Sequence, residues 1–251
     1  MSDLFSIKNK VALVTGGSRG IGLMIARGYV EAGARVYVSS RKKETCDQVA
    51  AELSRIGTCM SAPADCSTQA GCEALAAAVA ARESRLDILV NNAGANWGAP
   101  LAEYPDTAWD KVLALNVKAI FHLTRACLPM LRAAATAADP ARVINIGSID
   151  GLHVPLLETY AYSSSKAAVH HLTRVLAMRF APDHITVNAV APGAVLPPDD
   201  WPVAARDRLA ATTPLRRLGS PDDVVRAVVF LLENDYLTGV VLPVDGGRLV
   251  R

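Results

Sequence analysis

Tyr162 and Lys166 are the two residues whose types and spacing first indicate chemistry. They stand about one helical turn apart, so on a helix both side chains project from nearly the same face. A free phenol loses its proton only at about pH 10. A nearby ammonium group favours the phenolate, so we expect Lys166 to lower the pKa of Tyr162. A tyrosine tuned in this way can donate a proton to a carbonyl oxygen or accept one from an alcohol.

A glycine-rich segment near the N-terminus predicts a phosphate site. The apolar run Val11 to Thr15 has strand length, Gly16 to Gly22 follows it, and Leu23 to Ala32 has a helical pattern. Glycines let a phosphate approach the backbone, and a helix N-terminus offers free N–H groups and the positive end of a dipole. The spacing is TGxxxGxG, which differs from the long GxGxxG dinucleotide fingerprint. We predict that this turn binds a phosphate group.

The same alternation of strand and helix continues along the chain and predicts the fold class. Further strands are expected at 34–39, 59–64, 86–90, 142–146, 185–190 and 237–244, and further helices at 44–56, 68–82, 107–132, 160–180 and 221–233. Alternation without a break predicts one parallel sheet covered by helices on both faces. No linker divides the chain, so we expect a single domain over residues 1–251. The exception is an insertion at about 194–220, placed where open α/β sheets bind their ligands.

Composition excludes several classes of function. Among 251 residues, 51% are hydrophobic and 20% are charged, which supplies a sizeable core. The net charge of +2 gives no reason to expect a nucleic acid or an acidic membrane as partner. The five cysteines are scattered without metal-ligand spacing, so we expect reduced thiols and no metal site. The sequence shows neither a signal peptide nor an apolar run long enough to span a bilayer, and we expect a cytoplasmic protein.

Six motifs, taken in order, resemble those of the short-chain dehydrogenase/reductase family over essentially the whole chain. They are Thr15-Gly16-x-x-x-Gly20-Ile21-Gly22, Asn91-Asn92-Ala93-Gly94, Asn116, Ser148, Tyr162-x-x-x-Lys166 and Pro192-Gly193. The resemblance implies an α/β fold, a Rossmann-like doubly wound sheet of seven parallel strands with helices on both faces.

The resemblance also implies catalytic roles. Tyr162 would be the proton donor, and Ser148 would hydrogen-bond the substrate carbonyl. Lys166 would bind the nicotinamide ribose as well as lower the pKa of Tyr162, and Asn116 would hold a water that links Lys166 to solvent. The reaction that needs these parts is hydride transfer between a nicotinamide cofactor and a carbonyl carbon, with negative charge growing on the carbonyl oxygen.

The choice of cofactor follows from the end of the second strand. An NAD enzyme places an acidic residue there, whereas this chain has Ser40 followed by Arg41, with Arg19 nearby in the glycine turn. Two guanidinium groups in place of a carboxylate favour a 2′-phosphate, and therefore NADP(H). The residues expected to contact the cofactor are Gly16, Ser18, Arg19, Gly20, Ile21, Gly22, Ser40, Arg41, Asp65, Cys66, Asn92, Ala93, Gly94, Tyr162, Lys166, Pro192, Gly193 and Val195.

Within the family, residues 91–104 and 142–193 look most like 3-oxoacyl reductases, including the subgroup linked to rhamnolipid synthesis. The expected substrate pocket comprises Trp97, His153, Val154, Leu156, Leu196 and Trp201. This set is largely apolar and has no Arg or Lys, which favours an acyl chain or a bulky apolar ketone. A carrier-protein thioester, a CoA thioester and a free ketone all stay open, as do a quinone, pterin or sugar substrate. The alternative of a different class is a non-catalytic NADP-binding regulator.

The expected helices at 107–132 and 160–180 are apolar over more than one face. One face can pack on the sheet, and the other needs a partner. The family resemblance implies a homotetramer built across these helices.

Overall fold

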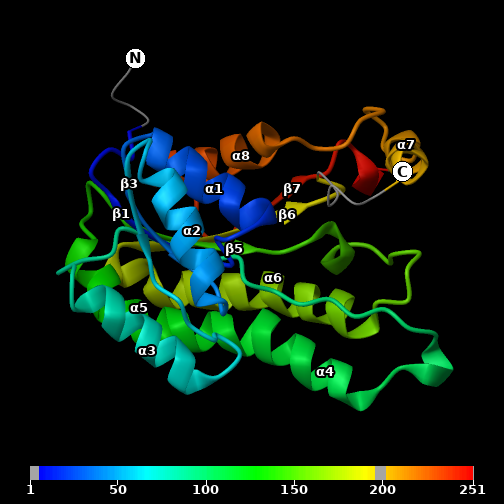
Figure 1. Cartoon of the computed structure of the whole chain (residues 1–251), viewed down its shortest axis with the longest axis horizontal. Coiled ribbons are helices and arrows are strands. Elements are labelled where there is room, and N and C mark those ends of the chain that lie inside the picture. Colours follow the sequence, from blue (N-terminus) through cyan, green and yellow to red (C-terminus); the bar gives the residue numbers. More distant parts are fainter. Residues whose placement is uncertain (1–5, 196–201, 251) are drawn as a thin grey trace.

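One sheet of parallel strands forms the centre of the molecule, and helices cover both of its faces (Figure 1). The computed structural model describes residues 6–195 and 202–250. Within these residues the strand order is β3-β2-β1-β4-β5-β6-β7, and every neighbouring pair is parallel. The strands are β1 Val11–Thr15, β2 Arg35–Ser39, β3 Thr58–Ser61, β4 Ile88–Asn91, β5 Ala141–Ile146, β6 Ile185–Pro192 and β7 Val241–Val244. The expected doubly wound α/β sheet of seven strands is confirmed.

The helices divide into two layers around the sheet. They are α1 Gly20–Glu31, α2 Lys43–Leu53, α3 Gln69–Ala80, α4 Asp106–Leu113, α5 Ala119–Ala134, α6 Tyr160–Phe180, α7 Val203–Ala211 and α8 Pro221–Glu233. Figure 1 shows α1, α2 and α8 on one side of the sheet and α3 to α6 on the other. Each layer buries its own apolar cluster against the strands, and the strand residues alternate between the two clusters. This burial on both faces explains why the strands read as continuous apolar runs.

The strand order places the carboxyl ends of β1, β4 and β5 side by side. β1 pairs with β2 on one edge and with β4 on the other, so successive connections leave β1 in opposite directions. Such a switch point, at the carboxyl ends of the strands, is where open α/β sheets hold their ligands. The glycine segment after β1 and the Asn-Asn-Ala-Gly segment after β4 therefore meet at this edge.

The helical run expected at 107–132 is confirmed, and it extends from residue 106 to residue 134. A π-helical turn, Ala114–Lys118, lies within it between α4 and α5, and Asn116 is in the middle of this turn. The sequence did not predict the turn, because apolar periodicity does not reveal a single inserted residue in a helix. Such π-turns occur frequently at functional sites.

Several other boundaries differ from the sequence prediction; for example, α2 ends at Leu53 and not at residue 56, and β3 ends at Ser61 and not at residue 64. Two further differences have a clear physical reason. Helix α1 begins at Gly20 and not at residue 23, so the glycine segment itself supplies the N-terminus of the helix. Strand β7 begins at Val241 and not at residue 237, since Gly239 adopts a φ of +77°, which is incompatible with an extended strand.

The insertion after β6 forms the helix α7 and returns to the sheet. Val195 makes an isolated parallel bridge with Gly219, and the capping residue Ser220 then starts α8. The predicted pocket residues Leu196 and Trp201 lie outside the described residues. No helix in the described ranges is long and apolar enough to cross a membrane.

Candidate active site

Ser148 stands just beyond the carboxyl end of β5, at the start of a short 3-10 turn, Ile149–Gly151. Its backbone is extended, and its Oγ accepts a hydrogen bond from the Asp150 backbone N–H at 3.1 Å. The side chain is buried. The turn therefore holds Ser148 at the edge of the sheet where the strand ends meet.

Tyr162 reaches Ser148 from the third position of α6. The Ser148 hydroxyl lies close enough to the phenol to affect its pKa, so the fold brings these two residues together. The pKa of Tyr162 is raised by burial, and the Ser148 hydrogen bond offsets only part of this rise, while the nearby Asp150 carboxylate adds to it. The expected lowering of this pKa by Lys166 is therefore wrong for the protein by itself, because desolvation of the phenolate dominates.

Lys166 lies one turn further along α6 and is buried. Its Nζ donates a hydrogen bond to the Ile146 carbonyl oxygen at 2.7 Å and lies 5.4 Å from the centroid of the Tyr162 ring. Burial lowers the pKa of Lys166 to about 8. The ammonium is thus held beneath the phenol by a strand carbonyl, at a distance where its charge still acts on the ring.

Asn116 is tied to two elements of the site through its side-chain amide. Its Oδ1 accepts from the Ala95 backbone N–H at 2.7 Å, and its Nδ2 donates to the Ala95 carbonyl at 3.0 Å. The same Nδ2 donates to Ser165 Oγ at 2.9 Å, and Ser165 Oγ in turn donates to the Tyr162 carbonyl at 2.6 Å. Asn116 therefore couples the loop after β4 to the helix that carries Tyr162.

The glycine turn is fixed to the end of β4 by hydrogen bonds. Thr15 Oγ1 donates to the Val90 carbonyl and accepts from the backbone N–H groups of Asn92 and Ala93 at 3.0 and 3.1 Å. Asn92 Nδ2 returns a bond to the Thr15 carbonyl at 2.9 Å. A Cβ on Gly22 would lie only 2.3 Å from the Gly16 carbonyl oxygen, so the turn requires glycine there.

Gly20 has a different environment from the other glycines of the turn. It adopts a φ of +54°, and a Cβ added there would meet no atom within 4 Å. The start of α1 is therefore packed tightly against the segment after β4 at Gly16 and Gly22, whereas no atom lies close to Gly20 on the side where its Cβ would be. This arrangement lets a phosphate approach the backbone N–H groups.

Two arginines stand beside this opening. Arg19 follows β1 and Arg41 follows β2, and these strands are neighbours in the sheet. Both side chains are exposed, and neither forms an ion pair with another described residue. The Ser40 carbonyl accepts from the Ala64 N–H at 3.1 Å, which brings Asp65 and Cys66 to the same edge.

The remaining predicted cofactor residues lie at the end of β6. Pro192 pairs with Val244 in the sheet, and the Gly193 N–H donates to the Val244 carbonyl at 2.9 Å. A Cβ on Gly193 would lie 2.8 Å from Cα of Asp245, so only glycine permits this approach. The predicted residues thus gather along the carboxyl ends of five neighbouring strands, β2, β1, β4, β5 and β6, with Asp65 beyond β3.

The similarity of this chain to known proteins decides its family. Residues 10–206 match the family profile described as short chain dehydrogenase. The chain belongs to the short-chain dehydrogenase family.

One relative by sequence and two solved structures illustrate the similarity to the short-chain dehydrogenase family. A 3-oxoacyl-(acyl-carrier-protein) reductase of rhamnolipid biosynthesis from Pseudomonas aeruginosa is 46% identical, with 98% of this chain and 99% of the relative covered. The Pseudomonas aeruginosa RhlG/NADP active-site complex superposes with a TM-score of 0.95 at 45% identity, covering 99% of this chain and 100% of that one. L-sorbose reductase from Gluconobacter frateurii, complexed with NADPH and L-sorbose, gives a TM-score of 0.91 at 30% identity, covering 98% and 99%.

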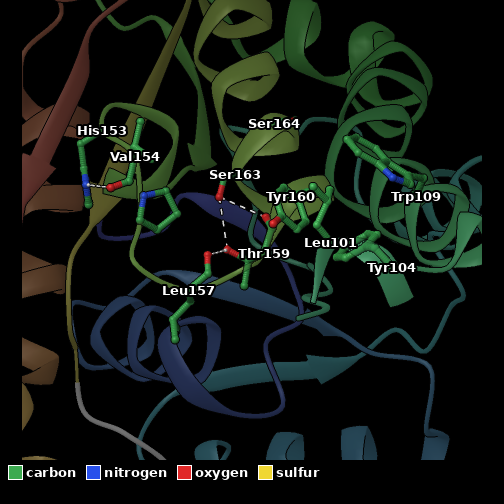
Figure 2. Close-up of a pocket in the computed structure, with 11 residues that line it drawn as sticks. Leu101, Tyr104, Trp109, His153, Val154, Leu157, Thr159, Tyr160, Ser163 and Ser164 are labelled. Carbon is green, nitrogen blue, oxygen red and sulfur yellow. Dashed lines mark hydrogen bonds between the residues drawn. The ribbon is translucent and has the colours of Figure 1, made fainter. Parts of the chain in front are cut away.

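The predicted substrate pocket of this short-chain dehydrogenase is only partly reproduced. A cavity of about 480 Å³ opens between the start of α4 and the start of α6, and Figure 2 shows His153 and Val154 on one side of it and Tyr104 and Trp109 on the other. Two of the six predicted residues, His153 and Val154, line this cavity, whereas Trp97 and Leu156 do not.

The cavity does not open onto the catalytic face of α6. Its helical wall is formed by Tyr160, Ser163 and Ser164, which by helical periodicity lie on another face than Tyr162 and Lys166. The loop 152–157 protrudes, so Leu156 is fully exposed. Trp97 lies instead beneath the ammonium of Lys111, which is 5.2 Å from its ring centroid.

Several positioning residues of this short-chain dehydrogenase were missed by sequence reasoning. Asn91 Nδ2 donates to Asn145 Oδ1 at 2.9 Å, and Asn145 Nδ2 donates to Thr173 Oγ1 at 3.0 Å. All three are buried, and the chain of bonds joins β4, β5 and α6. The available signal was a polar residue near the end of an otherwise apolar strand, since a buried amide requires a partner.

The glycine turn yields a prediction about stability. We expect Gly22→Ala to lower the free energy of unfolding by about 3 kcal/mol, because its methyl group collides with the Gly16 carbonyl and with Asn92. Gly20→Ala, which meets no atom within 4 Å, should cost only about 1 kcal/mol of backbone strain. Urea denaturation of the two variants measures the difference, and equal losses would contradict the packing of the turn.

The burial of Lys166 yields a prediction about pH. Its pKa is about 8 in the folded chain against 10.5 ordinarily, so between these values the unfolded chain binds more protons. The parent therefore gains stability as pH rises through this window, whereas Lys166→Met cannot. The melting temperature of the variant minus that of the parent should fall from about pH 7.5 to about pH 10. The exposed Lys118→Met is the control and should show a constant difference, and the prediction fails if Lys166→Met does the same.

Proposed function

We propose that this protein is an NADPH-dependent carbonyl reductase in which Tyr162 donates the proton and Ser148 holds the carbonyl oxygen. The observation that carries the proposal is the placement of the Ser148 hydroxyl close enough to the Tyr162 phenol to lower its pKa, above the buried Lys166 at the carboxyl end of β5. Two hydroxyl groups that already face one another can both turn to one oxygen between them. This is the arrangement required to stabilise negative charge that develops on a carbonyl oxygen.

The protonation states of the site suit reduction at neutral pH. Because the pKa of Tyr162 is raised, the phenol carries its proton and can donate it. The loss of that proton leaves a phenolate, which the ammonium of Lys166 stabilises from beneath. Asn116 holds α6 against the loop after β4, so the phenol keeps its position during the transfer.

The turn after β1 fits the pyrophosphate of a dinucleotide. Gly16 and Gly22 pack against neighbouring backbone and side-chain atoms, whereas Gly20 has free space beside it, so the N-terminus of α1 is accessible to an anion. Arg19 and Arg41, exposed on neighbouring strand ends, would hold a 2′-phosphate, and Lys166 would meet the nicotinamide ribose. The cofactor, when bound, supplies the hydride that is transferred to the carbonyl carbon. The NADP of the RhlG complex supports this assignment.

The substrate we propose is a 3-oxoacyl thioester or a similar apolar ketone. The loop between Ser148 and α6 presents apolar side chains to solvent outside the cavity described above, with Leu152 42% exposed and Leu156 fully exposed. Exposed aliphatic groups beside a catalytic residue favour an apolar substrate, because its binding removes them from water. The 3-oxoacyl reductase of Pseudomonas aeruginosa supports the same substrate class.

We propose further that the protein assembles as a homotetramer across α5 and α6. Phe121 on α5 and Val175 and Met178 on α6 are exposed, and Met178 retains 77% of its accessible surface. Apolar side chains on the outer faces of two helices are explained by a second copy that covers them.

The assignment of Tyr162 is tested by removing one oxygen atom. Tyr162→Phe should reduce the rate of NADPH oxidation with acetoacetyl-CoA or a longer β-keto ester by at least ~100-fold. NADPH binding should change by less than about twofold, since only the proton donor is lost. Tyr160→Phe is the matched control, because the Tyr160 hydroxyl bonds to the exposed Glu158 and should leave the rate unchanged. A native protein that binds NADPH but reduces no carbonyl compound would establish the regulator instead.

The cofactor preference is tested at the end of β2. The native protein should prefer NADPH to NADH by at least tenfold in kcat/KM, equivalent to about 1.4 kcal/mol. Ser40→Asp combined with Arg41→Ser should reverse the preference, because a carboxylate accepts from a ribose hydroxyl and repels a phosphate. Lys43→Ala removes a cation that already pairs with Asp47 and should leave the preference intact. Equal efficiency of the native protein with both cofactors would refute the assignment.

The assembly is tested by light scattering at micromolar concentration. The native protein should have about four times the monomer mass, and Met178→Glu should reduce it by placing a charge in the interface. Ile56→Glu alters another exposed apolar residue, after α2 on the opposite face of the sheet, and should leave the mass unchanged. A monomer mass for the native protein would rule out the tetramer.

A further inference from the structure

His170 is a buried histidine directly behind the catalytic loop. It lies on α6 one turn after Lys166, and only 3% of its surface is exposed. Its imidazole packs between Gly147 and Gly151, the two glycines that bracket Ser148. None of the catalytic roles proposed above uses this side chain.

The contacts of His170 explain why both neighbours are glycine. A Cβ on Gly147 would lie 2.3 Å from His170 Nε2 and 2.8 Å from its Cδ2. A Cβ on Gly151 would lie 2.9 Å from His170 Cε1 and 2.6 Å from the Ala167 backbone nitrogen. The ring therefore touches the backbone on both sides of Ser148, at a distance that leaves no room for the loop to approach α6 further.

His170 is held there as a neutral ring. Its pKa is lowered to about 4, chiefly by burial; the Gly151 backbone opposes this in part, and the neighbouring Lys166 and Arg174 cations contribute to the lowering. Neither ring nitrogen makes a hydrogen bond of ordinary geometry to a described residue. A buried imidazole that gains so little from polar contacts contributes here chiefly through its shape and position.

We propose that His170 is a positioning residue that sets the place of Ser148 relative to Tyr162 by wedging the loop 147–151 away from α6. This inference rests on the proposed function, in which Ser148 holds the carbonyl oxygen. A wedge is required because Ser148 stands on a loop and Tyr162 on a helix, and a shift of about 1 Å between two such groups can cost about 100-fold in rate.

The wedge also affects the acidity of the phenol. The Ser148 hydrogen bond lowers the pKa of Tyr162 against the effect of burial. If the loop collapses toward α6, this bond weakens and the pKa of Tyr162 rises. Lys166, with a pKa of about 8, titrates before Tyr162, so the two groups give separate limbs at high pH. In the reductive direction the protonated phenol is the active form, so the upper of these limbs should then move to higher pH.

Four single variants test the proposal in steady-state assays with NADPH and a β-keto ester. His170→Ala should lower kcat at least tenfold, leave the dissociation constant of NADPH within about twofold and shift the upper of the two high-pH limbs to higher pH. His170→Gln refills most of the volume and should recover more than half of the lost activity. His171→Ala changes the neighbouring histidine, which is exposed, and should behave as the parent. Gly147→Ala should be strongly impaired, because its methyl group collides with the imidazole.

A double variant decides whether the collision is with His170 itself. The double variant, Gly147→Ala with His170→Ala, should be at least fivefold more active than Gly147→Ala alone. Its melting temperature should be higher than the value obtained by adding the two single-variant changes to the melting temperature of the parent. A parent-like kcat and pH profile for His170→Ala would overturn the proposal. Additive effects of the two substitutions on activity and melting temperature would also overturn it, as would a loss of NADPH affinity in His170→Ala as large as its loss of kcat. If the parent reduces no ketone, the proposed function fails instead, and coupling in melting temperature still decides whether His170 supports the loop.

Discussion

The close packing of α6 against the end of β5 is the constraint on which the site depends. Lys166 is buried under the Tyr162 ring, and the Ile146 carbonyl is the acceptor for its ammonium group. A buried cation is costly unless it is hydrogen-bonded, so the strand end must come within reach of the helix. Gly147 and Gly151 make that approach possible, because any larger residue would collide with α6. The catalytic loop and the catalytic helix thus determine one another.

Buried polar contacts connect this centre to the rest of the sheet. Thr15 fixes the glycine turn to the end of β4, and Asn91 continues through Asn145 to Thr173 on α6. In an apolar interior each of these groups must be paired, and the pairing is possible in only one register of the strands. The glycine turn and Tyr162, which are distant in the sequence, are therefore placed relative to each other by amide and hydroxyl groups that have no part in the proposed reaction.

The site combines a rigid frame with an exposed apolar rim. Ser148, Lys166 and Asn116 are buried and fixed by several neighbours, whereas the loop 152–157 carries aliphatic side chains in full contact with water. Catalytic groups need exact placement, and substrate groups need surface that becomes buried only on binding. The same division accounts for a family in which a common reaction centre serves different carbonyl compounds, since the rim can change without disturbing the frame.

Taken by itself, the sequence determined the fold class, the order of strands and helices and the glycine turn, and it predicted the four residues proposed for the reaction centre. Periodicity and glycine spacing are local properties, and Tyr162 and Lys166 belong to one helix, so their relation follows from helical geometry. Only the tertiary structure decided the direction in which the pKa of Tyr162 shifts, because burial depends on every element packed around the ring. It also decided the π-turn at Asn116, the face on which the cavity opens and the position of His170. Each of these depends on contacts between residues far apart in the chain, which no local pattern records.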